Sequence, residues 1–363
     1  MPKIFTLFFA LISIVTIAQN EKKANDSKYK ILSDEIPVWL DEYDVPAVSV
    51  AIVDNGKIVY HQAFGLQSPE KPATNETLFL SASIAKPMTA EVFLRLASLG
   101  KVNLDEHMAN HWLDPDIADD PRAKLLTPRH VLTHQTGFKN WRRMTDGKLR
   151  FERDPGTEMG YSGEGFLYLV RFLEGKLGKP FNQLAEEVLF EPEQIQNASY
   201  VYQKRFENKM AWAYFPDGNW RESRKVESAF GAGGLRITAE DYAKFILSIL
   251  NEDRVTSKLR TEQFSISLNQ FSHCQKKATT PDACPENAGF GLGWYVYGFE
   301  DETIIGHTGA NMGERTLAVF SPKNKTGLVV MTIGANGNEV IYRIAENKGV
   351  HQGFIELEKP KKK

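Results

Sequence analysis

A serine and a lysine three residues apart could form a nucleophile with its own base. Ser83 and Lys86 lie in "LSASIAKPMTAEVF", where the apolar spacing predicts a helix that ends near Gly100. Side chains at positions i and i+3 share one helix face. A lysine can take the proton of a serine hydroxyl when burial lowers the lysine pKa. Acyl transfer through Ser83 is one interpretation of this pattern, but many proteins have the same spacing by chance, with a capping serine beside a surface lysine.

Two histidine pairs also have a spacing that could do chemistry. His107 with His111, and His130 with His134, stand four residues apart, as zinc ligands on one helix face do. Neither pair has a glutamate directly after its first histidine, which a zinc protease helix would carry. We therefore expect no metal site, and the chemistry at Ser83 needs no cofactor.

Strand-like segments at both ends of the chain must form the framework for these residues. "AVSVAIVDNGKIVYHQAFG" predicts a hairpin that turns at Asp54-Asn55-Gly56, and strand patterns return after Gly289. The part between them has helical periodicity. We expect an α+β fold, in which N- and C-terminal strands form one antiparallel sheet flanked by helices and a mostly helical domain is inserted. The expected divisions are a sheet domain at 19–80 and 221–350, a helical domain at 81–220 and a solvated charged tail at 351–363.

The ends and the composition limit the location and the partners. The basic start "MPK" and the apolar run Ile4–Ala18 predict an export signal at 1–18. The alternative, an uncleaved anchor, needs about 20 apolar residues. We expect a periplasmic or secreted protein with no membrane span after signal cleavage, in which Cys274 and Cys284 form a disulfide. A net charge of −2 argues against nucleic acid, so the expected partner is a small-molecule or peptide substrate, and the oligomeric state cannot be predicted.

Six segments occur in the order and rough spacing of a known group of enzymes. They are "FLSASIAKPMTA", "LTPRHVLTHQTGFKNW", "DPGTEMGYSGEGF", "GAGGLRITAEDYAKF", "GFGLGWYVYG" and "GHTGANMGERTLAVFSPKNKTGLVVMT". From about Leu32 to Glu346 the chain resembles the serine β-lactamase superfamily, within it the class C β-lactamase and D-alanyl-D-alanine carboxypeptidase-like serine hydrolases. The resemblance implies an acyl-enzyme on Ser83 and a structural role for His134.

The resemblance also assigns the other site residues. Tyr161, in the second box, would work with Lys86 as base or proton relay. The third box would be His307-Thr308-Gly309, which is followed by two strands, and these residues would line the substrate side. The oxyanion hole would be the backbone N–H groups of Ser83 and Ala310. Lys325-Thr326-Gly327 has the composition of a third box, but it falls in the turn between the last two strands, where we expect a solvated lysine.

Two positions depart from the family pattern and leave the substrate open. Gly163 stands where the second box has asparagine, which would hold a substrate amide. His307 stands where the third box has lysine, so the cation for a substrate carboxylate would appear only as the pH falls toward about 6. We expect hydrolysis of an amide or ester of the β-lactam or D-amino-acid peptide type. The alternatives are a carboxylesterase, or a penicillin-recognising sensor that acylates without turnover.

Overall fold

A single sheet made from both ends of the chain organises the molecule. The computed structural model describes residues 29–251, 254–270 and 284–360. Eight strands have the order β3-β2-β1-β13-β12-β11-β10-β9, with every neighbouring pair antiparallel. β1 pairs with β13, so the first and last long strands lie side by side, and the expected α+β class is confirmed. The bounds are β1 Ala47–Asp54, β2 Lys57–Ser68, β3 Lys71–Pro72, β9 Asn287–Phe290, β10 Tyr295–Gly298, β11 Thr303–Ala310, β12 Glu314–Ser321 and β13 Thr326–Ile333.

The predicted hairpin lies between β1 and β2. Asn55 and Gly56 both have positive φ, 50° and 69°, as a two-residue turn between twisted strands requires. The register opposes Asp54 to Lys57 next to this turn. The Asn-Gly pair thus fixes the start of the sheet in the predicted place.

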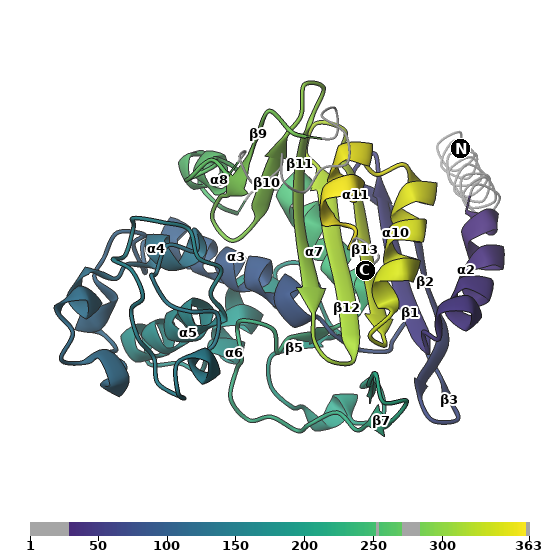
Figure 1. Cartoon of the computed structure of the whole chain (residues 1–363), viewed down its shortest axis with the longest axis horizontal. Helices are drawn as coiled ribbons and strands as arrows, with labels where there is room; N and C mark the ends of the chain where they lie inside the picture. The colour runs from purple at the N-terminus through teal and green to yellow at the C-terminus, as the bar shows by residue number, and fades with distance from the viewer. Residues whose placement is uncertain (1–28, 252–253, 271–283, 361–363) are drawn as a thin grey trace, which may run out of the picture.

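One face of the sheet is covered by helices from the two ends of the chain: α2 (Lys30–Tyr43), α10 (Gly337–Lys348) and α11 (Gln352–Glu358) (Figure 1). Leu32 and Ile36 of α2 are buried against this face. The expectation of a solvated charged tail at 351–363 is wrong for Gln352–Glu358, because this segment forms α11 and its Phe354 and Ile355 are also buried against this face. The aromatic and aliphatic side chains of α11 outweigh its charged flanks.

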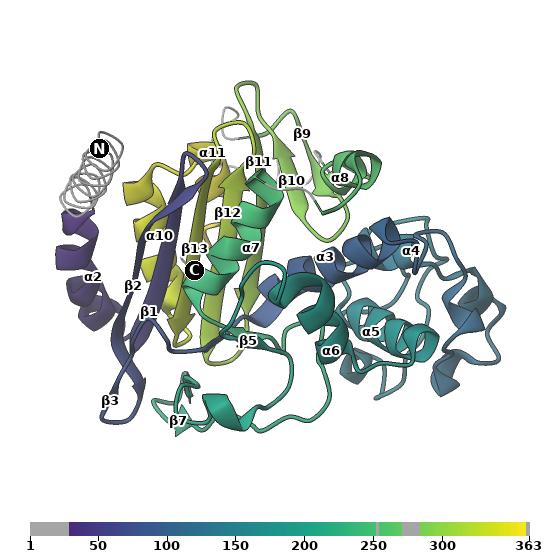
Figure 2. The same ribbon diagram turned by 180° about the vertical axis from the view of Figure 1, so that it is seen from behind.

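The other face packs against α7 (Ala239–Asn251), and the helical part lies to one side of the sheet (Figure 2). One buried apolar cluster includes residues of the sheet and of this part, among them Ile84 and Ala85 next to Ser83. The remaining helices are α3 Ala85–Ser98, α4 Pro128–Leu132, α5 Gly163–Leu177, α6 Phe181–Ala185 and α8 Ser257–Gln263. The short strands are β4 Phe79–Leu80, β5 Ala198–Ser199, β6 Ala213–Tyr214, β7 Trp220–Arg221 and β8 Arg236–Ile237. The short 3₁₀ and π turns are Ala82–Ile84, Met108–Asn110, Pro115–Ile117, Pro121–Leu125, Arg142–Met144, Glu186–Phe190 and Lys204–Phe206.

A buried ion network anchors α3, the helix that carries Lys86. Glu91 is fully buried and accepts hydrogen bonds from Arg95 at 3.0 Å and from Arg260 at 2.9 Å. Burial raises the pKa of Glu91, but the two arginines outweigh it and hold the pKa below its usual range. A buried carboxylate is tolerated when it is paired in this way, so α3 is fixed against α8.

The termini and cysteines complete the comparison with the sequence. The expected signal at 1–18 lies outside the described residues. Cys284 is disulfide-bonded. Its expected partner, Cys274, lies outside the described residues. In the part of the chain that the structure describes, no helix is long and apolar enough to cross a membrane.

Candidate active site

Ser83 lies in a tight turn that the surrounding strands hold in place. The turn Ala82–Ile84 connects β4 to α3, and Ala82 has a φ of 46°, which an alanine adopts at an energetic cost. The neighbouring Ser81 donates its N–H to the Leu235 carbonyl at 2.9 Å. Its own carbonyl accepts the hydroxyl of Thr316 at 2.8 Å. These bonds to β12 and to the segment before β8 fix a strained backbone, which is typical of functional sites.

Lys86 is buried next to the serine hydroxyl. Its Nζ lies 3.1 Å from Oγ of Ser83 and donates to the Ala232 carbonyl at 2.6 Å. The side chain is 0% exposed, and burial lowers its pKa to about 7. Near neutral pH much of the lysine is therefore an amine, which can keep its N–H on Ala232 and accept the Ser83 proton on its lone pair.

Tyr161 is the third member of this group. Burial raises the pKa of Tyr161, while a hydrogen bond to the Ser83 side chain works in the opposite direction. Nζ of Lys86 lies 4.8 Å from the centre of its ring. Tyr161 thus stays a neutral phenol that can pass a proton, and Lys86 is the better initial base.

His134 supports Tyr161 from behind. The two rings stack with centroids 4.3 Å apart and an angle of 29°. Nδ1 of His134 accepts the backbone N–H of Ser162 at 3.1 Å, so the neutral ring carries its proton on Nε2. Burial, with the nearby charge of Lys86, holds the pKa of His134 well below 6.5. A neutral, fully buried ring of this kind positions Tyr161, which agrees with the structural role that the resemblance implies.

The third box brings β11 against the serine turn. A Cβ placed on Gly309 would lie 2.1 Å from Oγ1 of Thr316 and 2.9 Å from the backbone nitrogen of Ser83. Only glycine allows β11 to come this close. Ala310 follows at the end of the strand and, like Ser83, faces the adjoining pocket. The two residues expected to form the oxyanion hole therefore lie on one pocket wall.

His307 does not have the electrostatics expected from the sequence. Its Nδ1 lies 2.7 Å from the Thr308 carbonyl, which can only accept, so Nδ1 carries the proton. Burial, followed by the charge of Lys86, lowers the pKa of His307 to about 3. The expectation that a cation would appear here toward pH 6 is wrong, because protonation would place a second positive charge in a buried site.

The missing side chain at Gly163 is replaced by an aromatic ring from another segment. A Cβ at Gly163 would lie 2.3 Å from Cη2 of Trp141. The indole therefore occupies the space of the asparagine that the family has in its second box. Trp141 in turn stacks on Phe230, with centroids 5.6 Å apart. An amide-binding position has become part of an apolar wall.

The pocket at Ser83 has a volume of about 740 Å³, large enough for a substrate of drug size. Besides Ser83 and Ala310 its walls include Trp141, Phe230 and Met312. The residues behind the wall are the other expected site members, Lys86, Tyr161, Gly163, His307, Thr308 and Gly309, none of which is among the residues that line it. The structure thus separates a buried proton-transfer group from an open substrate surface.

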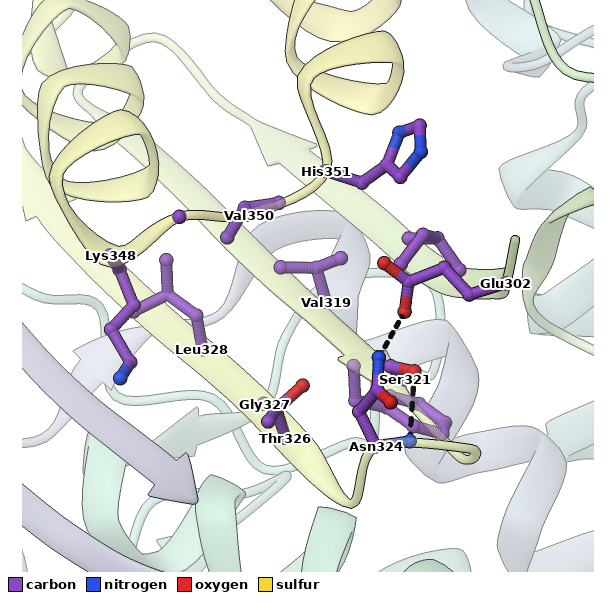
Figure 3. A pocket seen from close by; sticks show the side chains of 13 residues that line it. Glu302, Val319, Ser321, Asn324, Thr326, Gly327, Leu328, Lys348, Val350 and His351 are labelled. Atoms are coloured by element: carbon purple, nitrogen blue, oxygen red, sulfur yellow. Dashed lines mark hydrogen bonds between the residues drawn. The ribbon is translucent and has the colours of Figure 1, made fainter. Parts of the chain in front are cut away.

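The other motifs lie away from this pocket. Lys325 is exposed in the turn at the far end of β12 from Ser83, as expected. A smaller cavity lies beside this turn, and Figure 3 shows Glu302, Asn324 and His351 at its edge. Asp301, Glu302 and His351 form the one group with metal-like spacing among the described residues. However, Nδ1 of His351 accepts the N–H of Gly353, so its proton is on Nε2, which faces Asp301 at 3.3 Å and leaves no lone pair for a metal.

Comparison with known proteins agrees with this geometry. The family model described as Beta-lactamase matches residues 17–348. The chain belongs to the beta-lactamase family. It is 22% identical to "Teichoic acid D-alanine hydrolase" of Staphylococcus aureus, over 95% of this chain and 85% of that one, and 22% identical to "Penicillin-binding protein 4" of Amycolatopsis lactamdurans, over 81% and 82%.

Solved structures show the same fold. D-alanine carboxypeptidase AmpC from Burkholderia cenocepacia superposes with a TM-score of 0.72 at 19% identity, covering 89% of this chain and 98% of the other. A class C beta-lactamase mutant superposes with a TM-score of 0.70 at 17% identity, covering 89% and 97%. As a member of the beta-lactamase family, the protein is a serine hydrolase.

Several pocket residues were not predicted as site residues. Trp141, Arg143, Arg224 and Phe230 lie in short turns and loops whose paths no periodicity predicts, although Trp141 ends one of the six family segments. The hydrogen bond from Lys86 to the Ala232 carbonyl could not be predicted from local patterns either, since it joins residues 146 positions apart. The glycine at position 163 was the only indication that something else must fill that space.

Proposed function

We propose that this member of the beta-lactamase family is an exported serine hydrolase that opens an ester or amide through an acyl-enzyme on Ser83. The observation that carries the proposal is the position of Lys86, buried, with a pKa lowered to about 7 and its Nζ 3.1 Å from Oγ of Ser83. A buried lysine without a carboxylate partner would be a pure cost in stability unless its amine were used.

The steps follow from the positions of the groups. Lys86 takes the proton of Ser83 as Oγ bonds to the substrate carbonyl carbon, and the carbonyl oxygen gains its charge near the N–H groups of Ser83 and Ala310. Tyr161 passes the proton from Lys86 to the leaving group, whose bond to the carbonyl carbon breaks. Water then adds to the acyl-enzyme and gives up a proton to the same pair, which releases the acid and restores Ser83.

The two departures favour esters over β-lactams. A β-lactam brings a carboxylate and an amide, and here the third box offers a neutral histidine while Trp141 fills the amide position. The relative named for teichoic acid D-alanine hydrolysis indicates that D-alanyl substrates belong among the candidates. Export is supported by the apolar run Ile4–Ala18 and by the disulfide at Cys284.

The test compares initial rates on 4-nitrophenyl butyrate and on a chromogenic cephalosporin, with residues 19–363 as the enzyme. We expect ester turnover well above cephalosporin turnover. We expect Ser83→Ala to abolish both turnover and labelling by a fluorophosphonate. Undiminished turnover in Ser83→Ala would refute the assignment, and burst labelling without turnover would instead indicate the penicillin-recognising sensor.

A further inference from the structure

The lining of the pocket at Ser83 contains basic side chains. Three arginines line it: Arg142, Arg143 and Arg224. Glu164 is the acidic residue of the lining, and Arg142 engages it through its backbone N–H at 2.9 Å and its guanidinium at 3.0 Å. The Arg142 guanidinium also pairs with Asp114 at 3.0 Å and with Asp116 at 3.2 Å, so three carboxylates already neutralise its charge.

Arg143 and Arg224 differ from Arg142. Both are exposed, and neither has an ion-pair or hydrogen-bonded partner within residues 29–251, 254–270 and 284–360. The guanidinium of Arg143 lies over the Trp141 ring, 5.8 Å from its centre. A guanidinium is charged at every working pH and offers a planar set of donors that fits carboxylate and phosphate oxygens. Arg143 and Arg224 both line this one catalytic pocket, and they are the kind of groups that an anion-binding wall requires.

The same wall has an apolar strip next to the charges. Trp141 and Phe230 stack with an angle of 20° between their rings, and Phe230 is 40% exposed. An aromatic ring left this open in a catalytic pocket provides a surface for an apolar part of a substrate. A cation beside an aromatic surface selects a molecule with an apolar segment that ends in an anion.

The third box on β11 provides no such cation. His307 is buried and carries no positive charge near neutral pH, and Lys86 is covered by Ser83 and Ala232. We propose that Arg143 and Arg224 bind an anionic group of the substrate, carboxylate or phosphate, and that Trp141 and Phe230 bind the apolar segment that joins this anion to the scissile carbonyl. The inference rests on the proposed function of Ser83. It assigns recognition of the substrate anion to residues outside the third box.

The experiment uses pairs of esters that differ only in charge. In one pair, 4-nitrophenyl hexanoate is compared with the mono-4-nitrophenyl ester of adipic acid, which ends the same six-carbon acyl chain in a carboxylate. In the other, phenyl hexanoate is compared with 3-carboxyphenyl hexanoate, which places the anion on the leaving group. We expect the wild type to prefer the anionic ester in one pair by about tenfold in kcat/KM, mainly through KM. That pair tells which side of the carbonyl faces the arginines.

Substitution assigns the preference to the two residues. Arg143→Gln with Arg224→Gln should remove the preference by lowering kcat/KM for the anionic ester about tenfold relative to the neutral ester of the same pair. The matched control is Arg150→Gln, an exposed arginine that lies 3.7 Å from Asp146 and does not line the pocket. Competition by monohexyl phosphate and by hexanoate identifies the class of anion, and inhibition by the tighter of the two should weaken about tenfold in the double variant. Raising the salt from about 0.05 to 0.5 M should reduce the preference, because exposed charges are screened.

The outcomes separate this inference from the proposed function. Neutral esters hydrolysed with no charge preference, or a preference that survives the double variant, would overturn the anion wall and leave the role of Ser83 intact. If no ester is turned over, calorimetric titration of Ser83→Ala with monohexyl phosphate and hexanoate still measures anion binding at Arg143 and Arg224. Anion binding that the double substitution does not weaken then overturns the inference.

Discussion

Replacing Lys86 with methionine tests the central electrostatic feature of the site. Methionine has a similar length and no charge, and in this position it would remove the proposed base. We expect Lys86→Met to lose hydrolysis and at the same time to become more stable toward unfolding. Gain of stability with loss of activity is typical of residues that are buried for function rather than for the fold.

The size and pH window of the stability effect follow from the pKa. A lysine pKa lowered from 10.5 to about 7, at about 1.4 kcal/mol per pKa unit, corresponds to about 5 kcal/mol of unfavourable free energy in the folded state. Because the unfolded chain binds the proton more tightly, this cost is absent above pH 10.5, grows as the pH falls and is complete below about pH 7. The unpaired Ala232 carbonyl in the variant costs about 1–3 kcal/mol at every pH. At pH 7 about 4 kcal/mol of the lysine cost is present, so the net gain there is about 1–3 kcal/mol.

The assay is urea unfolding of wild type and Lys86→Met at pH 7 and pH 9.5. The difference in the free energy of unfolding between the two proteins should change by about 3 kcal/mol between these pH values, with the variant favoured at pH 7. The exposed Lys101, replaced in the same way, serves as the control and should show no such change. A difference that is the same at both pH values would refute the depressed pKa and, with it, the assignment of Lys86 as base.

Two further predictions concern the departures from the family pattern. Because activity requires a neutral Lys86, kcat/KM should fall as the pH falls through about 7. His307→Gln should leave this midpoint in place, since His307 is already neutral with a pKa of about 3. A midpoint that moves by more than about one pH unit in the variant would contradict this expectation. Gly163→Asn alone should destabilise the protein by about 1–3 kcal/mol, because its Cβ would lie 2.3 Å from Cη2 of Trp141. Thermal unfolding should show a smaller loss for this change when Trp141→Gly is also present, and additive losses would show that the two residues do not share one space.

The fold was largely predictable from local patterns. The Asn55-Gly56 turn, the periodicity of α5 and the strand pairs after Gly289 each follow from short-range rules, and each is present in the structure. α11 was missed because its charged C-terminal neighbours dominate the composition, while Phe354 decides where it packs. Composition describes an average over a segment, and a single buried aromatic can outweigh it.

The site was predictable only in part. The resemblance indicated Ser83, Lys86 and Tyr161, and the structure brings these three together. It could not indicate that Trp141 fills the space above Gly163, because that contact joins a turn to a helix start through tertiary packing alone. Nor could it give the pKa of His307, which depends on burial and on the distance to Lys86 rather than on residue type.

The exchange of lysine for histidine at position 307 and the unpaired arginines have a common physical explanation. A lysine at 307 would hold a second ammonium close to Lys86 in a buried region, and each charge would depress the pKa of the other. Histidine can shed its proton, so the electrostatics of Lys86 are set by burial alone, as its pKa shift indicates. The cation that a charged substrate needs must then come from elsewhere, and Arg143 and Arg224 lie on an exposed wall where a permanent charge costs little. Separating the proton-transfer group from the anion-binding group in this way lets the pKa of the base and the charge preference of the pocket vary independently.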